Sequence, residues 1–280
     1  MTAWIDEVHE GTSRFGLKLK RTLYEAQSAL QRITIVETEA QGRALLLDGL
    51  WMATEADEAT YHEMLVPPAL VTAPRIGRVL VIGGGDGGSV REVLRHPEVE
   101  EVELVEVDGM VVEACREHLP GIGTAWDDPR LQVHIADGAQ WVNDCAPGYY
   151  DVILVDGSDP VGPAMVLFGD GFLRDCAAAL APDGVLAVQA GSPELQREVH
   201  LGLVRGLRKH FTDARPYYGT VGIYPGGAWS WAWATRGAGR HDRPFPDRVA
   251  RLERRTHHYD HAIHLGAFAM PNHVRRALDR

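Results

Sequence analysis

Acidic residues stand at or just after the ends of successive predicted strands in the middle of the chain. Asp86 follows the first of these strands, either Glu106 or Asp108 ends the second, Asp137 follows the third and Asp156 ends the fourth. Ligands of an open parallel sheet bind beyond the carboxyl ends of its strands, so these side chains are expected to line one cleft. A cleft lined by carboxylates favours a ligand with cationic or hydroxyl groups.

A glycine-rich segment, Gly83-Gly-Gly-Asp-Gly-Gly88, follows the first of these strands and precedes a helix-like segment. A strand, a glycine-rich turn and a helix start are typical of nucleotide-binding sites. Gly83 and Gly85 are expected to let the backbone approach a cofactor or co-substrate closely. Asp86 carries a negative charge within the turn, which disfavours a pyrophosphate group and therefore an NAD-dependent oxidoreductase.

Glu106 lies 20 residues beyond Asp86. An acidic residue about 20 positions after such a turn commonly accepts hydrogen bonds from ribose hydroxyls. This spacing is also compatible with a nucleoside that has no pyrophosphate.

The segment Asp156-Gly-Ser-Asp159-Pro-Val-Gly-Pro163 follows an apolar strand. Two aspartates three positions apart, stiffened by Pro160 and Pro163, predict a small rigid anionic pocket. Alternatively, Asp159 caps the helix that follows.

Composition narrows the class of protein. The chain has 280 residues, of which 45% are hydrophobic and 24% charged, and a net charge of −11, as expected for a globular enzyme. This charge disfavours binding to nucleic acids or anionic membranes and suits a cationic small substrate, although it also serves solubility alone. Three cysteines without a Cys-x-x-Cys pair, a polar start and the lack of an apolar run of about 20 residues predict a cytoplasmic protein.

Residues 1–54 are predicted to be β structure, with a strand over 31–38 and a hairpin around Asp48-Gly49. Glu7, with Asp6 and Glu10, is expected on a solvated surface. Thr54 is the expected N-cap of a helix that carries Tyr61-His62-Glu63. Pro67, Pro68 and Pro74 predict a break, so a β-strand and hairpin domain of residues 1–70, with its linking helix, is expected to precede a catalytic domain of residues 71–280.

The remaining chain alternates strands and helices, which predicts an α/β fold with a mostly parallel sheet. The helices include 109–118 and 166–180, and residues 236–255 are expected to be a solvated connection. Trp229, Trp231 and Trp233 are expected on one buried strand face. Strands are expected at 78–83, 102–107, 131–136, 151–156 and 185–190, followed by an antiparallel hairpin of 215–224 and 229–235.

Histidines at helical spacing near the C-terminus, His257, His258, His261 and His264, are the one candidate metal cluster. No pattern of carboxylates or cysteines accompanies them, so no metal site is expected.

Taken together, these motifs resemble the spermidine synthases, or polyamine aminopropyltransferases. The resemblance extends from about residue 4 to the C-terminus. It rests on the glycine turn, Val105-Glu-Val-Asp108, Asp137-Gly138, Asp156-x-Ser-Asp-Pro-x-Gly-Pro-Ala164, Leu47-Asp-Gly49, Thr54-Glu-x-Asp-Glu58, Tyr61-His-Glu63 and Ala267-Phe-Ala-Met-Pro271.

The resemblance implies a small N-terminal β domain, a methyltransferase-like Rossmann domain and a homodimer or homotetramer. It implies transfer of an aminopropyl group from decarboxylated S-adenosylmethionine, a co-substrate, to a diamine with release of methylthioadenosine. Asp156 would be the catalytic base, assisted by Tyr61. The amine would be bound by Tyr61, His62, Asp86, Asp159 and Tyr224, and the nucleoside donor by Gln31, Glu106, Asp137, Gly138 and Pro163.

The identity of the amine stays open at this point. Putrescine is the leading acceptor, and cadaverine, agmatine, diaminopropane and spermidine are alternatives. Gly157, Ile223 and Met165 depart from the family pattern near the expected acceptor pocket, and Leu30 departs from it before Gln31. An amine N-methyltransferase that uses S-adenosylmethionine and a polyamine sensor without activity are the rival functions.

Overall fold

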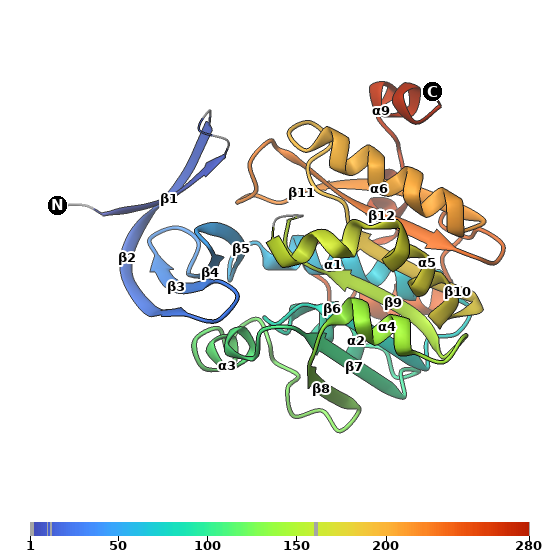
Figure 1. Cartoon of the computed structure of the whole chain (residues 1–280), viewed down its shortest axis with the longest axis horizontal. Coiled ribbons are helices and arrows are strands. Elements are labelled where there is room, and N and C mark those ends of the chain that lie inside the picture. The colour runs from blue at the N-terminus through green and yellow to red at the C-terminus, as the bar shows by residue number, and fades with distance from the viewer. Residues whose placement is uncertain (1–2, 10, 12, 160–161, 280) are drawn as a thin grey trace.

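The computed structural model describes residues 3–9, 11, 13–159 and 162–279, with only the backbone at residues 162 and 163. Its N-terminal part is a five-stranded antiparallel sheet that forms a half-barrel beside the larger domain (Figure 1). The strands follow one another in the order β1 (Trp4–His9), β2 (Ser13–Gln27), β3 (Arg32–Thr38), β4 (Arg43–Leu47) and β5 (Leu50–Thr54).

The tight turn between β4 and β5 is the predicted hairpin. Asp48 and Gly49 both have positive φ, 51° and 84°, as the twist of a two-residue hairpin requires.

Helix α1 (Glu58–Leu70) begins later than predicted. Asp57 occupies the N-cap position, and the Thr54 hydroxyl donates a hydrogen bond to the Asp57 carboxylate at 2.6 Å instead of capping the helix. The prediction of Thr54 as N-cap is therefore wrong. Pro67 and Pro68 lie inside the helix without ending it, because burial of nearly the whole helix outweighs the missing N–H donors. The domain boundary near residue 70 stays a prediction.

The larger sheet has seven strands in the order β11-β12-β10-β9-β6-β7-β8. β10, β9, β6, β7 and β8 are parallel neighbours, and β12 and β11 complete the edge as antiparallel strands, which confirms the predicted fold class. Their bounds are β6 (Arg78–Gly83), β7 (Glu101–Glu106), β8 (Leu131–Ile135), β9 (Tyr150–Asp156), β10 (Leu180–Gln189), β11 (Asp213–Thr220) and β12 (Ala228–Thr235).

Helices cover both faces of this sheet (Figure 1). Side chains alternate along β6, so Val79 and Val81 join one apolar cluster while Leu80 and Ile82 join the other. α1, α2 (Gly88–Leu94), α7 (Pro246–Leu252) and α8 (His261–Ala267) contribute to the first cluster. The second includes α4 (Gly138–Asp144), α5 (Asp170–Ala179), α6 (Arg197–His210) and α9 (Asn272–Leu278), while α3 (Gly109–His118) packs against the N-terminal sheet.

Two segments differ from the sequence-based expectation. The single helix predicted over 166–180 is a 3₁₀ segment, η1 (Gly162–Phe168), followed by α5. The arginine-rich segment 236–255 is not merely a solvated connection, because it contains α7, and Arg248 donates hydrogen bonds to the carbonyls of Leu70 and Ala73. The three alternating tryptophans of β12 are buried, as expected.

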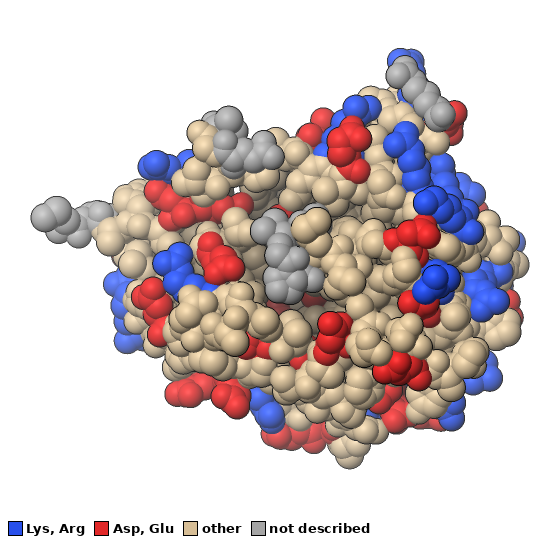
Figure 2. Space-filling model, viewed as in Figure 1, with Lys and Arg blue, Asp and Glu red and all other residues tan. Residues whose placement is uncertain are grey.

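Acidic and basic side chains both occur on the face shown in Figure 2, with basic ones gathered toward α6 and α9. Within the described chain, no helix is both long and apolar enough to cross a membrane.

Glu63 ties helix α1 to the C-terminal part of the chain. Its buried carboxylate accepts hydrogen bonds of 2.7–2.9 Å from the backbone N–H groups of His257, His258 and Tyr259. A buried acceptor with three backbone donors stabilises this turn.

We predict that Glu63→Ala lowers the free energy of unfolding by about 2–4 kcal/mol, since three backbone donors, one of them buried, lose their acceptor. Urea unfolding measures the change. The matched control is Glu113→Ala on the exposed face of α3, expected to change stability by less than about 0.5 kcal/mol. Equal midpoints for the two variants would contradict the prediction.

Candidate active site

A cavity of about 350 Å³ lies at the carboxyl ends of β6, β7 and β9 and is closed on its other side by the β4–β5 hairpin. Carboxylates from successive strand ends line it, as the sequence predicts: Asp86, Glu106, Asp137 and Asp156, with Asp159 nearby. Gln31, Gly83, Gly85, Gly138, Tyr61 and Tyr224 are also in the wall. The larger domain and the N-terminal sheet therefore build this site together.

Glu106, not Asp108, lines the cavity after β7. Asp108 accepts hydrogen bonds from the Ser28 hydroxyl at 2.6 Å and the Gln31 amide at 3.0 Å, and it caps α3. Glu106 accepts one from the backbone N–H of Asp108 at 3.0 Å, and burial raises its pKa to about 7. Glu106 therefore changes charge near neutral pH.

The glycines of the turn serve close packing within the protein as well as access to a ligand. Gly83 has a φ of 77°, and a Cβ atom added there would lie 2.3 Å from the carbonyl oxygen of Asp156. A Cβ at Gly85 would lie 3.1 Å from Oε2 of Glu106, and one at Gly138 would lie 2.3 Å from Cγ2 of Ile82. These contacts bring the strand ends close enough to share one cavity.

The Asp156 carboxylate is held by two hydroxyl groups. Tyr61 donates a hydrogen bond to Oδ1 at 2.8 Å, and Ser89 donates one to Oδ2 at 2.6 Å. Burial raises the pKa of Asp156, against the opposing effect of His62, and the Asp86 charge raises it further. Burial and Asp156 raise the pKa of Tyr61 well above its ordinary value, so Tyr61 stays a hydrogen-bond donor. Nothing in the sequence pattern singled out Ser89.

His62 lies one layer behind the cavity. Among the described residues, it is not part of either cavity wall, and it is 1% exposed. Its Nδ1 atom is 2.7 Å from Glu58, and its Nε2 atom is 3.4 Å from Asp86. His62, Asp86 and Asp156 bring one possible metal-ligand atom each within 4.8 Å of one another, and an imidazolium between carboxylates accounts for the same spacing.

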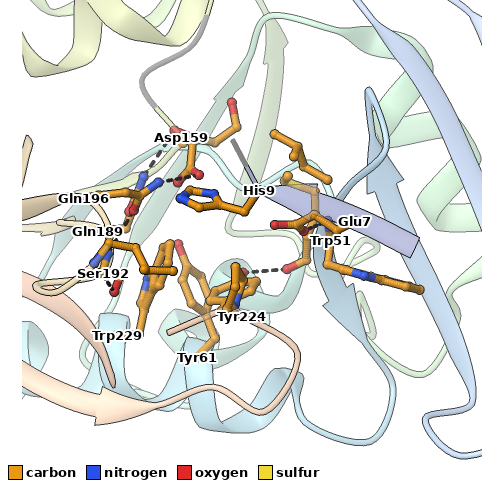
Figure 3. A pocket seen from close by; sticks show the side chains of 16 residues that line it. Glu7, His9, Trp51, Tyr61, Asp159, Gln189, Ser192, Gln196, Tyr224 and Trp229 are labelled. Atoms are coloured by element: carbon orange, nitrogen blue, oxygen red, sulfur yellow. Dashed lines mark hydrogen bonds between the residues drawn. The ribbon is translucent and has the colours of Figure 1, made fainter. Parts of the chain in front are cut away.

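A smaller cavity of about 40 Å³ adjoins the larger one and shares Tyr61, Asp159 and Tyr224 with it (Figure 3). Asp159 accepts a hydrogen bond of 2.6 Å from Gln196, and burial raises its pKa. The Tyr224 hydroxyl donates to the carbonyl of Met52 at 2.6 Å, so this ring closes the wall between the two domains.

Glu7 corrects a sequence-based expectation. The sequence predicts it on a solvated surface, but Glu7 is 6% exposed, lines the smaller cavity and accepts a hydrogen bond of 2.8 Å from the backbone N–H of Trp51. Burial raises its pKa. Glu10 and Pro160 lie outside the described residues, as does the side chain of Pro163.

Gln31 and Asp137 are positioned by their own hydrogen bonds. The Gln31 amide donates to Asp108, while Asp137 accepts from the backbone N–H groups of Ala139 and Gln140 and so caps α4. Both residues line the larger cavity.

The doubly wound sheet and the acid-lined cavity at its strand ends define an α/β enzyme with its ligand site at the carboxyl edge of the sheet. Comparison with known families then narrows this class. Residues 58–240 match the spermine/spermidine synthase domain, and residues 3–55 match the spermidine synthase tetramerisation domain. The chain belongs to the spermidine synthase family and is a polyamine aminopropyltransferase, as the sequence motifs predict.

Related proteins match over nearly their whole length. The polyamine aminopropyltransferase of Prochlorococcus marinus strain MIT 9313 is 46% identical over 98% of this chain and 96% of its own. A crystal structure of spermidine synthase in complex with the transition-state analogue AdoDATO superposes with a TM-score of 0.95 at 37% identity, covering 99% of this chain and 95% of that one. Spermidine synthase from Thermotoga maritima gives 0.94 at 37% identity, covering 99% of this chain and 94% of that one.

Gly88 leaves room for the His62 ring. A Cβ atom at Gly88 would lie 2.3 Å from Cε1 of His62. We predict that Gly88→Ala lowers the free energy of unfolding by about 1–3 kcal/mol, because the buried ring must move. In urea unfolding, the control Gly171→Ala, which meets no described atom within 4 Å, should be neutral or gain up to about 1 kcal/mol. A Gly88→Ala protein as stable as the control would show that the ring moves freely.

Proposed function

We propose that the enzyme transfers the aminopropyl group of decarboxylated S-adenosylmethionine to a diamine, most favourably putrescine, and releases methylthioadenosine and spermidine. The observation that carries this proposal is that Tyr61, which lines both cavities, donates a hydrogen bond to Asp156 in the wall of the larger one. A nucleoside donor in the larger cavity and an amine in the smaller one would then meet at a carboxylate.

The larger cavity suits the donor. Glu106 is the proposed acceptor of the ribose hydroxyls, and Gln31, Asp137 and Gly138 are proposed to contact the nucleoside. The polar atoms of Asp86 and Asp156 favour the positive sulfonium and ammonium of the donor. The sulfonium is already an activated leaving group, so the remaining tasks are positioning and removal of a proton from the amine.

The Asp156 carboxylate is the proposed base. An alkyl ammonium has an ordinary pKa of about 10.4, so its neutral form costs roughly 4–5 kcal/mol at pH 7. Burial works on both partners, because it lowers the pKa of the amine and raises that of Asp156. The amine also becomes more acidic as its bond to carbon forms, so the proton can leave late, with Tyr61 holding the carboxylate in place.

The other end of the diamine stays cationic and needs an anion. Among the residues that the structure describes, Asp159 and Glu7 are the carboxylates in the wall of the smaller cavity, and we propose that they bind this ammonium. A volume of about 40 Å³ favours a short diamine such as putrescine over the longer spermidine.

An N-methyltransferase that uses S-adenosylmethionine is the second candidate, because it would share the sheet and the ribose contact. Its donor carries a carboxylate, which would meet Asp86. At about 4 Å such repulsion is on the order of 4 kcal/mol in a partly screened site. Asp86 therefore favours the decarboxylated donor.

The N-terminal sheet is the proposed oligomer interface. Its matching family model is that of a tetramerisation domain, and Trp4 and Val8 on β1 are 61% and 52% exposed in the single chain. Exposed apolar side chains of this size favour contact with a second copy in a homodimer or homotetramer.

The first test of this function is an amine screen. We expect the protein to release methylthioadenosine from decarboxylated S-adenosylmethionine, fastest with putrescine among the five amines considered, as measured by mass spectrometry. Asp156→Asn should lower kcat by about 10²–10⁴-fold with little change in donor affinity. The control Asp144→Asn, on an exposed end of α4, should leave kcat unchanged. Methylation of an amine by S-adenosylmethionine, or a near-normal kcat for Asp156→Asn, would overturn the assignment.

The second test uses the pKa of Glu106. Below about pH 7 its carboxyl is protonated and cannot accept hydrogen bonds from both ribose hydroxyls. Affinity for methylthioadenosine should therefore rise as pH increases through about 7 and then level off, with proton release on binding near that pH. Titration calorimetry measures both. Glu106→Gln should bind more weakly and without this pH dependence, and an unchanged pH profile in this variant would exclude Glu106 as the responsible group.

A further inference from the structure

His62 sits in a buried row of charged groups behind the larger cavity. Its Nδ1 atom faces Oε2 of Glu58 at 2.7 Å. On the other side of the ring, Nε2 lies 3.4 Å from Oδ1 of Asp86 and 4.0 Å from Oδ2 of Asp156. Since carboxylates face both ring nitrogens, a proton on each nitrogen makes every one of these contacts favourable.

Glu58 is itself held in the ionised form. Arg91 donates hydrogen bonds to both of its oxygens, at 2.9 and 2.8 Å. Although burial alone would raise the pKa of Glu58, His62 and Arg91 lower it below its ordinary value. Glu58 therefore keeps a proton on Nδ1 of His62 and fixes the orientation of the ring.

Two other buried histidines contact neutral groups instead of carboxylates, and their pKa values are lowered. His200 faces the hydroxyls of Ser230 and Tyr218, and His264 faces the Tyr259 hydroxyl and a backbone carbonyl. Burial lowers the pKa of both to about 4, so they are neutral at pH 7. For His62, burial acts in the same direction, but Asp86 and Glu58 raise the pKa well above its ordinary value.

The His62 imidazolium lies closer to the Asp86 carboxylate than to the Asp156 carboxylate. It is closer to Asp86, which also accepts a hydrogen bond of 2.8 Å from the backbone N–H of Gly88. Asp156 is farther from the ring, and its hydrogen-bond donors are neutral hydroxyls. A charged Asp86 then disfavours a second negative charge on Asp156.

We propose that His62 is a positioning residue for the transfer: held as an imidazolium by Glu58, it keeps Asp86 ionised and so makes Asp156 the carboxylate that receives the proton of the amine. In that step the N–H bond of the amine breaks, its electron pair stays on nitrogen, and the proton passes to an Asp156 oxygen. This inference rests on the proposed aminopropyl transfer. It differs from the sequence-based expectation, in which His62 contacts the amine.

The groups around His62 come from several elements, and Asp86 and Glu58 act on its charge most directly. Tyr61 lies beside it with ring centroids 5.2 Å apart. The charged or titratable neighbours are Glu58 from α1, Asp86 from the glycine turn, Asp156 from β9 and, one layer farther out, Arg91 and Glu92 from α2 and Cys115 from α3. Arg91 is the one other cation in this set. It contacts Glu58 and Glu92 and donates a hydrogen bond to the Ile122 carbonyl, and its charge adds to that of His62 in lowering the pKa of Asp86.

The charge of His62 is directly measurable in the full-length enzyme. We expect nitrogen NMR of ¹⁵N-histidine-labelled protein to show one imidazolium that persists from about pH 6 to about pH 9 and disappears in His62→Gln. Glu58→Gln should bring its titration into this range. A His62 that is neutral at about pH 7 in the unchanged protein would overturn the inference, whatever the activity of the variants.

The role in catalysis is tested by the pH profile of kcat/KM for the donor. His62→Gln keeps a side chain that can hydrogen-bond but removes the positive charge. The pKa values of Asp86 and Asp156 should rise, so the acid limb of the profile should move up by about one pH unit or more, a loss of about tenfold near pH 6 that shrinks to less than about threefold near pH 9.

The matched control is His264→Gln, a buried histidine that is already neutral, and its profile should overlay that of the unchanged enzyme. A loss in His62→Gln that is equal at every pH would mean that His62 only fills space, and would overturn the inference. If the unchanged enzyme releases no methylthioadenosine with any amine, the proposed function itself fails, and the same assay reports this before any variant is compared.

Discussion

Repulsion between two buried carboxylates governs the architecture of the site. Asp86 and Asp156 have side chains only 12% and 8% exposed, and both are within 4.0 Å of the same imidazole ring. Burying two like charges is costly unless donors and cations face them. Helix α1 meets this demand because residues three and four positions apart share one helix face, which brings Glu58, Tyr61 and His62 together. Helix α2 adds the N–H of Gly88 and the hydroxyl of Ser89.

This constraint also explains why the glycine turn is built as it is. In a turn that binds phosphate, the backbone N–H groups point at an anionic ligand. Here the N–H of Gly84 donates to the Asp156 carbonyl at 2.9 Å, and that of Gly88 donates to Asp86. These donors are used by the protein itself. The turn thus presents a carboxylate to the cavity, and the sign of the ligand charge that it favours is inverted.

The sheet and much of the cavity wall were predictable from the sequence because both depend on local patterns. Apolar runs that end in acidic residues predict the strand ends, and Asp48-Gly49 predicts the hairpin. The helix start at Thr54 was wrong because Asp57 is engaged by the distant backbone of Ile223, a tertiary contact that local spacing does not encode. The burial of Glu7, the contact of Ser89 with Asp156 and the burial of His62 could not be predicted from the sequence for the same reason. Each of these residues is surrounded by segments that lie far away in the chain.

The smaller cavity brings together the first strand and the last strand of the chain. Glu7 comes from the first strand and Trp229 from the last, while Asp159 lies between them in sequence. Contacts between such distant segments form late, because a long loop must close before they are gained. During synthesis, β6, β7 and β9, whose ends line the larger cavity, are complete before β12, which supplies Trp229 to the smaller cavity, has been made. The order of assembly therefore separates the two halves of the site in time, and a chain without β1 or β12 lacks wall residues of the smaller cavity while retaining most residues of the larger one.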